Sequence, residues 1–141
     1  TTQREFDYNK YYYTAVDSGK RGNYPTTKVT GFNVTDNSVE ITTNSTSGYG
    51  VEFPVDLEVG KTYTLKWTIS VAQSRVFLLK FNNDTTYHSQ VQGVDATIGN
   101  TNAVGSYTAK IKPETGYKYS LLFANVTASK TPFTNISLTE N

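Results

Sequence analysis

The residues that decide the fold read VEFPVDL at 51–57, EVGK at 58–61 and TYTLKWTISV at 62–71. Apolar and polar side chains alternate in the first and last of these runs, which is typical of β-strands with one buried and one wet face. A helix is excluded, because apolar residues at i and i+2 would lie on opposite sides of it. Gly60 gives the backbone the freedom to turn between the runs. Pro54 lies on the polar side of the first run and predicts an edge position or a bulge there.

Length and composition narrow the class of protein. The 141 residues suit one domain that can bury a core, and the chain has no cysteine and one histidine, His88. Disulfides and multi-histidine zinc sites are therefore excluded. The net charge of +1 is spread along the chain and leaves no basic patch for nucleic acid, and no apolar run is long enough for membrane insertion. The chain begins with Thr1 and lacks methionine, so we expect a domain excised from a larger protein.

We call residues 51–71 the central stretch. Further strand-like runs lie on both sides of it. They predict a hairpin from residues 28–35 and 38–43, and strands at 75–82, 86–91, 104–112, 117–126 and 132–139. About nine strands without a helix must stack or close to hide their edges. We therefore predict an all-β fold, a two-sheet antiparallel β-sandwich of jelly-roll type, with an immunoglobulin-like sandwich as the alternative. Residues 1–141 form a single domain, in which 1–27 is an aromatic N-terminal arm or strand.

Three pieces of sequence resemble a known family. They read GYGVEFPV at 48–55, LEVGKTYTLKW at 57–67 and FTNISLTE at 133–140. In this order they are similar to jelly-roll domains of the carbohydrate-binding-module type, which occur on glycoside hydrolases and in tail and baseplate proteins of phages of Gram-positive bacteria. The resemblance runs from about residue 39 to the C-terminus. It implies a β-sandwich whose sugar site lies on the concave sheet or its rim loops, and an extracellular or virion-surface location. It assigns no individual binding residue.

The acidic residues do not predict catalysis. Glu52 and Asp56 are four residues apart on one strand, which separates them by roughly 13 Å. The paired carboxylates of a glycosidase are about 5–10 Å apart. The glycines at 48 and 50 lead into a strand rather than a helix, so they form no phosphate-binding loop. We expect no enzymatic activity and instead a module that adheres to a host cell by binding its surface polysaccharide.

A sugar site needs an aromatic face for the ring, and amides or charges for the hydroxyl groups. Lys66, Trp67 and their neighbours alternate in facing, so Lys66 is predicted to be exposed and Trp67 either to bind sugar or to join the core. If the strands that carry the exposed polar residues are neighbours, they form one mildly basic face. The candidate ligand-binding residues are Tyr49, Lys66, Trp67, Arg75, Tyr87, His88, Gln90 and Lys118.

Two alternatives remain open. The domain could instead be a structural or oligomer-interface domain of a virion or surface assembly, where exposed tyrosines of the N-terminal arm would contact other domains or subunits. No catalytic metal or organic cofactor is expected. A structural calcium ion is a further hypothesis, with Asp36, Asp84 or Asp95 and loop carbonyls as its ligands.

Overall fold

The computed structural model describes residues 2–4, 10–15, 21–22, 29–35, 37–43, 49–72, 74–81, 89–91, 104–125 and 130–141. These residues form strands and turns and no helix, so none of them makes a helix able to span a bilayer. The first six strands are β1 (Thr2–Arg4), β2 (Tyr12–Ala15), β3 (Arg21–Gly22), β4 (Val29–Thr35), β5 (Ser38–Thr43) and β6 (Tyr49–Val55). The others are β7 (Tyr63–Ile69), β8 (Ser74–Phe81), β9 (Ser89–Val91), β10 (Gly105–Ile111), β11 (Lys118–Asn125) and β12 (Lys130–Glu140).

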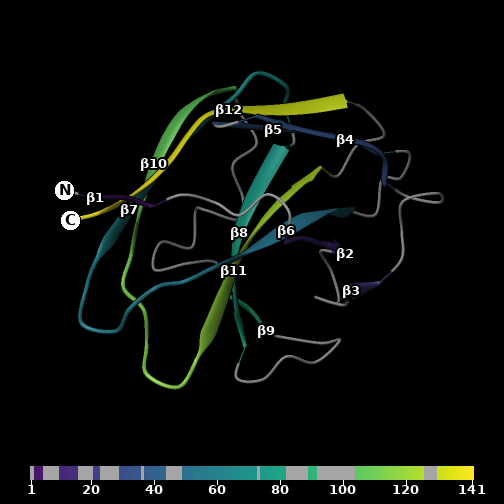
Figure 1. Ribbon diagram of the computed structural model, residues 1–141. Coiled ribbons are helices and arrows are strands. Elements are labelled where there is room, and N and C mark those ends of the chain that lie inside the picture. The colour runs from purple at the N-terminus through teal and green to yellow at the C-terminus, as the bar shows by residue number, and fades with distance from the viewer. Residues whose placement is uncertain are drawn as a thin grey trace.

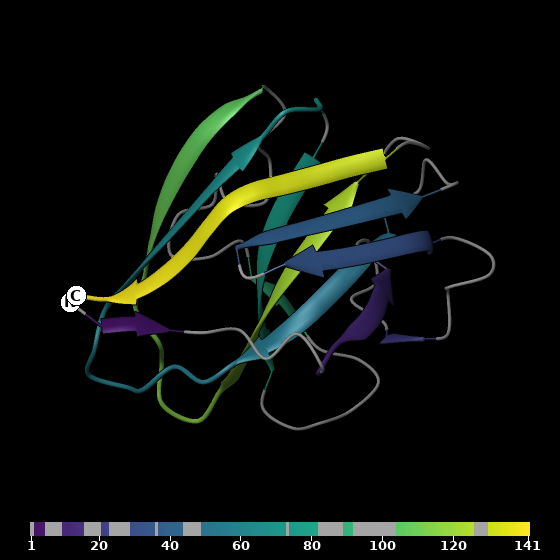
Figure 2. The same cartoon turned by 45° about the horizontal axis from the view of Figure 1, so that its top comes forward.

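The strands form two antiparallel sheets, seen as separate layers in Figures 1 and 2. Sheet A has the order β10-β7-β12-β5-β4, and β1 also pairs with β12. Sheet B has the order β3-β2-β6-β11-β8-β9. Because Thr2 lies opposite Glu140, the two ends of the chain are side by side (Figure 1). The structure thus confirms the predicted all-β sandwich of jelly-roll type over the immunoglobulin-like alternative.

The central stretch divides between the sheets. Its first strand, β6, lies in sheet B and its second, β7, lies in sheet A, so the turn at residues 58–62 carries the chain from one layer to the other. Strand β2 pairs with β6 only as far as Glu52. Pro54 therefore faces β11 on one side and, among the described residues, has no strand partner on the other. Because β6 is an inner strand of sheet B, the predicted edge strand is wrong. The missing N–H of Pro54 is tolerated because the pairing with β2 has already ended there. The hairpin predicted at residues 28–43 is present as β4 and β5.

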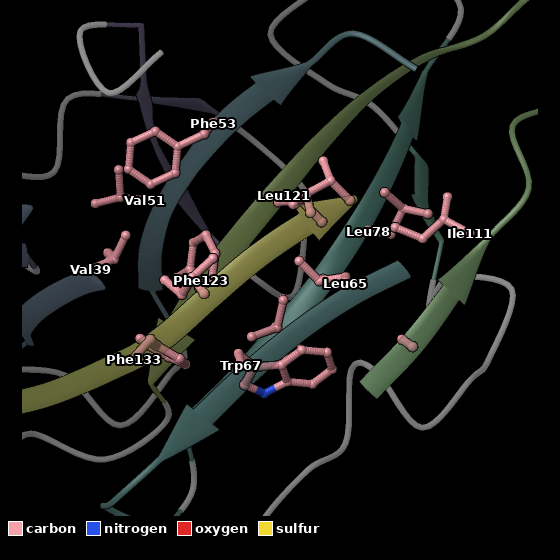
Figure 3. Packing of buried hydrophobic residues seen from close by; sticks show 14 of the residues in the cluster. Val39, Val51, Phe53, Leu65, Trp67, Leu78, Ile111, Leu121, Phe123 and Phe133 are labelled. Atoms are coloured by element: carbon pink, nitrogen blue, oxygen red, sulfur yellow. The ribbon is translucent and has the colours of Figure 1, made fainter. Parts of the chain in front are cut away.

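The core fills the space between the layers, where side chains from both sheets meet (Figure 3). Three phenylalanine rings cross it: Phe53 lies 5.9 Å from Phe123, and Phe123 lies 5.2 Å from Phe133, between ring centroids. Because Phe53 and Phe123 belong to sheet B and Phe133 to sheet A, these edge-on contacts tie the layers together. A buried side-chain hydrogen bond from Asn125 Nδ2 to Thr131 Oγ1 adds a second link, from the end of β11 to β12.

Two turns of the same design begin the strands β7 and β11. The sequences are EVGKTY at 58–63 and ETGYKY at 114–119, and Gly60 and Gly116 have φ of 93° and 88°, which a residue with a Cβ rarely adopts. In each turn the backbone N–H of the glutamate donates a hydrogen bond to the final tyrosine hydroxyl, 2.9 Å from Glu58 to Tyr63 and 2.8 Å from Glu114 to Tyr119. Both tyrosine rings are buried. The repeated motif therefore anchors one strand in each sheet.

We expect Tyr63→Phe and Tyr119→Phe each to lower the free energy of unfolding by about 0.5–1.5 kcal/mol, because each removes a hydrogen bond and leaves the ring in place. Urea unfolding followed by circular dichroism measures this. Tyr117→Phe, at an exposed position of the second turn, is the matched control and should change stability by less than about 0.5 kcal/mol. Equal effects at all three positions would contradict a role for the two turns.

Candidate functional site

Sheet B carries a second buried layer of side chains on the face turned away from the core. Phe77, Leu122 and Ala124 form a hydrophobic cluster there, separate from the main core. Strand pairing places four residues in one row across the sheet, namely Tyr12 opposite Glu52, Glu52 opposite Leu122, and Leu122 opposite Phe77. We call these four residues the central row. It spans about 14 Å over three strand spacings.

Glu52 is the polar group of the central row. The alternation in residues 51–57 predicted a wet face for it, and this is wrong, because Glu52 is 0% exposed. The reason is that both faces of β6 are covered: Val51 and Phe53 enter the main core while Glu52 joins the second layer. A carboxylate almost never lies fully buried unless it has partners, and Glu52 does make an electrostatic or hydrogen-bonding contact.

Ser120 is the second polar group of this face. It lies two residues before Leu122 on β11, opposite Pro54, and is 0% exposed. Among the described residues, its Oγ and the Trp67 Nε1 are the two buried side-chain polar atoms without a hydrogen-bond partner. A buried hydroxyl without a partner costs roughly 1–3 kcal/mol in lost hydration. Gly50 lies on the next row of β6, against β11. A Cβ added to Gly50 would come within 2.0 Å of the Phe123 carbonyl oxygen.

Tyr12 forms the open end of the central row. Its side chain is 44% exposed, whereas its neighbour Tyr13 faces the main core and packs against it. Tyr11 lies over the gap between the sheets, with ring centroids 4.9 Å from Phe32 and 5.8 Å from Tyr13. Burial, and to a lesser degree the neighbouring Tyr11, raise the pKa of the Tyr13 hydroxyl above its ordinary value. Within the N-terminal arm, β2 and β3 thus join sheet B, whereas β1 pairs with β12 of sheet A.

The structure separates the residues predicted to form one basic face. Lys66 is exposed on β7 of sheet A, while Lys118 is exposed at the start of β11 in sheet B. The premise that their strands are neighbours is therefore wrong. Arg75 pairs with Ala124, and Gln90 with Leu79, which gives both positions in sheet B; their side chains lie outside the described part. Tyr87 and His88 also lie outside the described residues, so their roles stay predictions.

Two predicted aromatic candidates face the core. Trp67 is 2% exposed and stacks on Tyr107 with ring centroids 5.8 Å apart, so its assignment to a surface sugar site is wrong. Figure 3 shows its indole ring among the core side chains. Tyr49 is half-buried and also packs against the main core. In both cases the alternation of the strand decides the direction of the side chain.

The described residues hold no group of three or more His, Cys, Asp or Glu side chains that could bind a metal ion. Asp36, Asp84 and Asp95 lie outside the described part. The calcium site therefore stays a prediction.

Sequence analysis did not single out Tyr12, Glu52 or Ser120 as ligand-binding residues. Glu52 was weighed only as half of a catalytic pair with Asp56. A signal for this face is present in YSLLFAN at 119–125, where apolar residues point to both sides of the strand. Such a strand must be covered on both faces. A serine within it, or a glutamate opposite it on the neighbouring strand, is then a buried polar group.

Comparison with known proteins finds the same fold. No family model and no curated protein match the chain. Among solved structures, the CBM22-1 xylan-binding domain of Paenibacillus barcinonensis Xyn10C has a TM-score of 0.54 and 10% identity, over 99% of this chain and 97% of that chain. The N-terminal cellulose-binding domain of Cellulomonas fimi β-1,4-glucanase C has a TM-score of 0.50 and 14% identity, over 96% and 91%.

The fold is carbohydrate-binding-module-like. The resemblance predicted from residues 48–67 and 133–140 is thereby confirmed for the fold. A phage structure is similar too: the enzymatically active domain of bacteriophage CBA120 tailspike protein 4 has a TM-score of 0.50 and 12% identity, over 94% of this chain and 19% of that chain.

Trp67 is the only tryptophan, so its fluorescence reports on the core alone. We expect blue-shifted emission in the folded protein, because the indole is buried and its Nε1 has no hydrogen-bond partner. Urea should shift the emission to the red, whereas saturating polysaccharide should leave the maximum unchanged. A shift on adding polysaccharide, with the fold intact by circular dichroism, would contradict the assignment of Trp67 to the core.

Proposed function

We propose that this chain is a non-catalytic carbohydrate-binding module that attaches its parent protein to a bacterial cell-surface polysaccharide. Tyr12 carries the proposal: it is 44% exposed at the end of the central row, on the outer face of a β-sandwich sheet. An aromatic ring stacks on the apolar side of a sugar. The other three residues of the row are buried, so the tyrosine is the part of the row that a sugar can contact.

Glutamates of the described part lie on both sheets and beside the turn that precedes β7. Glu52 lies on sheet B and Glu40 on the outer face of sheet A. Glu58 and Glu140 both contact Lys61, at 2.8 Å and 3.3 Å, where they brace the turn before β7 against the end of β12. These contacts give the two carboxylates a structural role.

The similar proteins support carbohydrate binding and, more weakly, a phage protein as the parent. Two of them are xylan- and cellulose-binding domains, and one is a domain of a phage tailspike. We propose a tail or baseplate protein of a phage of Gram-positive bacteria as the parent, with the module outside the cell or on the virion surface. A single shallow site would bind with a Kd of about 1 mM to 1 μM. Several copies on one particle would raise the avidity by roughly 10²–10⁴.

Tyr12→Ala tests the proposal. We expect the variant to bind extracted Gram-positive wall polysaccharide about threefold to tenfold more weakly, because it loses the stacking surface of the central row. Tyr117→Ala is the control: that tyrosine is 42% exposed, like Tyr12 at 44%, but precedes Leu122 by five residues, or roughly 17 Å along the strand. Both variants should unfold at nearly the same urea concentration as the unchanged protein.

Affinity electrophoresis, and pull-down of whole cells by a multimerised form, measure the binding. Saturable binding that soluble polysaccharide competes away, and that Tyr12→Ala weakens selectively, would support the proposal. No binding by the multimer would overturn it and favour a structural or oligomer-interface domain. Equal loss in the two tyrosine variants would place the sugar site elsewhere on the molecule.

A further inference from the structure

We infer that the outer face of sheet A binds a phosphodiester-linked sugar or polyol polymer, through Lys66, Lys110 and the hydroxyl groups beside them. This surface lies on β10, β7 and β12, which are neighbours in sheet A (Figure 2). Tyr12 belongs to the other sheet, so the inference adds a second binding surface and does not depend on the proposed function. It starts from a feature that the fold does not require, namely two exposed lysines on adjacent strands.

Strand pairing brings the two lysines together on one face. Lys66 lies opposite Thr108 of β10 on one side and opposite Ser137 of β12 on the other. We call these three residues the lysine row. Lys110 follows Thr108 by two residues on the same face, which makes it a diagonal neighbour of Lys66, roughly 7–8 Å away. Both lysines are exposed, so a polymer can reach them at once.

No acidic side chain on these strands balances the two lysines. Glu140 is the only acidic residue of β10, β7 and β12, and it contacts Lys61 at 3.3 Å. Edge strands often carry a lysine that prevents pairing with another molecule, and Lys110 on β10 fits that role. Lys66 does not, because β7 is an inner strand between β10 and β12. The pair is therefore a local positive charge on a chain whose net charge is only +1.

The lysine row also offers unused hydrogen-bond donors. Within the described part of the chain, the side chains of Thr108, Lys66 and Ser137 have no hydrogen-bond partner. On the neighbouring row, by contrast, the Thr68 and Ser106 hydroxyl groups bond to each other at 2.9 Å. A hydroxyl or ammonium group without a protein partner can donate to a phosphate oxygen. The row thus presents three donors in a line of about 10 Å, over two strand spacings.

The chemistry of this surface favours a phosphodiester polymer without bases. A lysine ammonium is a point charge that suits phosphate oxygens, whereas planar carboxylates are recognised best by the fork of an arginine. Serine and threonine hydroxyl groups are common donors to phosphodiester oxygens. Nucleic acid is disfavoured, because single strands stack their bases on exposed aromatic rings. The aromatic residues of these three strands lie in the core or pack against it, namely Tyr63, Trp67, Tyr107 and Phe133.

The experiment measures binding of poly(glycerol phosphate) to the 141-residue chain by calorimetry. If each lysine neutralises one phosphate, raising the salt concentration from about 50 to about 200 mM should weaken binding roughly sevenfold. Lys66→Gln should weaken binding about threefold to tenfold at the lower salt concentration, and should reduce the effect of salt to roughly threefold. The unchanged protein should bind polygalacturonate, oligothymidylate and uncharged dextran more weakly than poly(glycerol phosphate).

Lys130→Gln is the matched control, because it removes the same charge from the outer face of the same sheet. Lys130 contacts Glu40 at 3.5 Å and lies seven residues before Ser137 on β12. This variant should keep both the affinity and the effect of salt. Thr108→Val tests the hydroxyl group, and should weaken binding about twofold to threefold without changing the effect of salt. All three variants should unfold at nearly the same urea concentration as the unchanged protein.

Selective loss of binding in Lys66→Gln, with Lys130→Gln unaffected, would support the inference. Equal loss in the two lysine variants would overturn it, because net charge alone would then explain the binding. Equal or tighter binding of oligothymidylate or polygalacturonate would overturn the assignment of a phosphodiester polymer without bases. No measurable binding of poly(glycerol phosphate) would overturn the inference and leave the proposed function, which rests on Tyr12, intact.

Discussion

The packing of the two inner sheet faces against each other is the constraint on which the rest of the structure depends. Phe53, Phe123 and Phe133 form its centre and join sheet B to sheet A (Figure 3). Since successive residues of a strand point to opposite faces, committing Phe53 and Phe123 to the core also commits their neighbours to the outer face. Glu52 and Leu122 are such neighbours. The candidate site is therefore the reverse side of the core, built from the same strands.

The two turns of the E-x-G-x-x-Y type explain how the chain keeps this register without disulfides. Each turn ends in a buried tyrosine whose hydroxyl accepts a hydrogen bond from the first residue of the turn. A strand that slipped by one residue would withdraw its tyrosine from the core and expose the opposite face instead. Each sheet has one such anchor. Both tyrosines are buried in the same core as the phenylalanine rings that hold the two layers together.

The outer face of sheet B contains both a buried apolar cluster and an unsatisfied polar group. Its apolar residues are buried like a small core, while the Ser120 hydroxyl lacks a partner among the described residues. On the outer face of sheet A, by contrast, the Thr68 and Ser106 hydroxyl groups bond to each other.

The sequence by itself determined the all-β class, the inward-facing residues of β6 and β7, and the hairpin of β4 and β5, because these depend on local alternation and turn chemistry. The carbohydrate-binding-module-like fold came from the resemblance of residues 48–67 and 133–140 to that family. Only the tertiary structure decided which strands are neighbours. Pairing between distant segments brings Tyr12, Glu52, Leu122 and Phe77 into one row, separates Lys66 from Lys118, and buries Glu52. Alternation gives a residue its face, but not the strand that will lie beside it or the chain that will cover it.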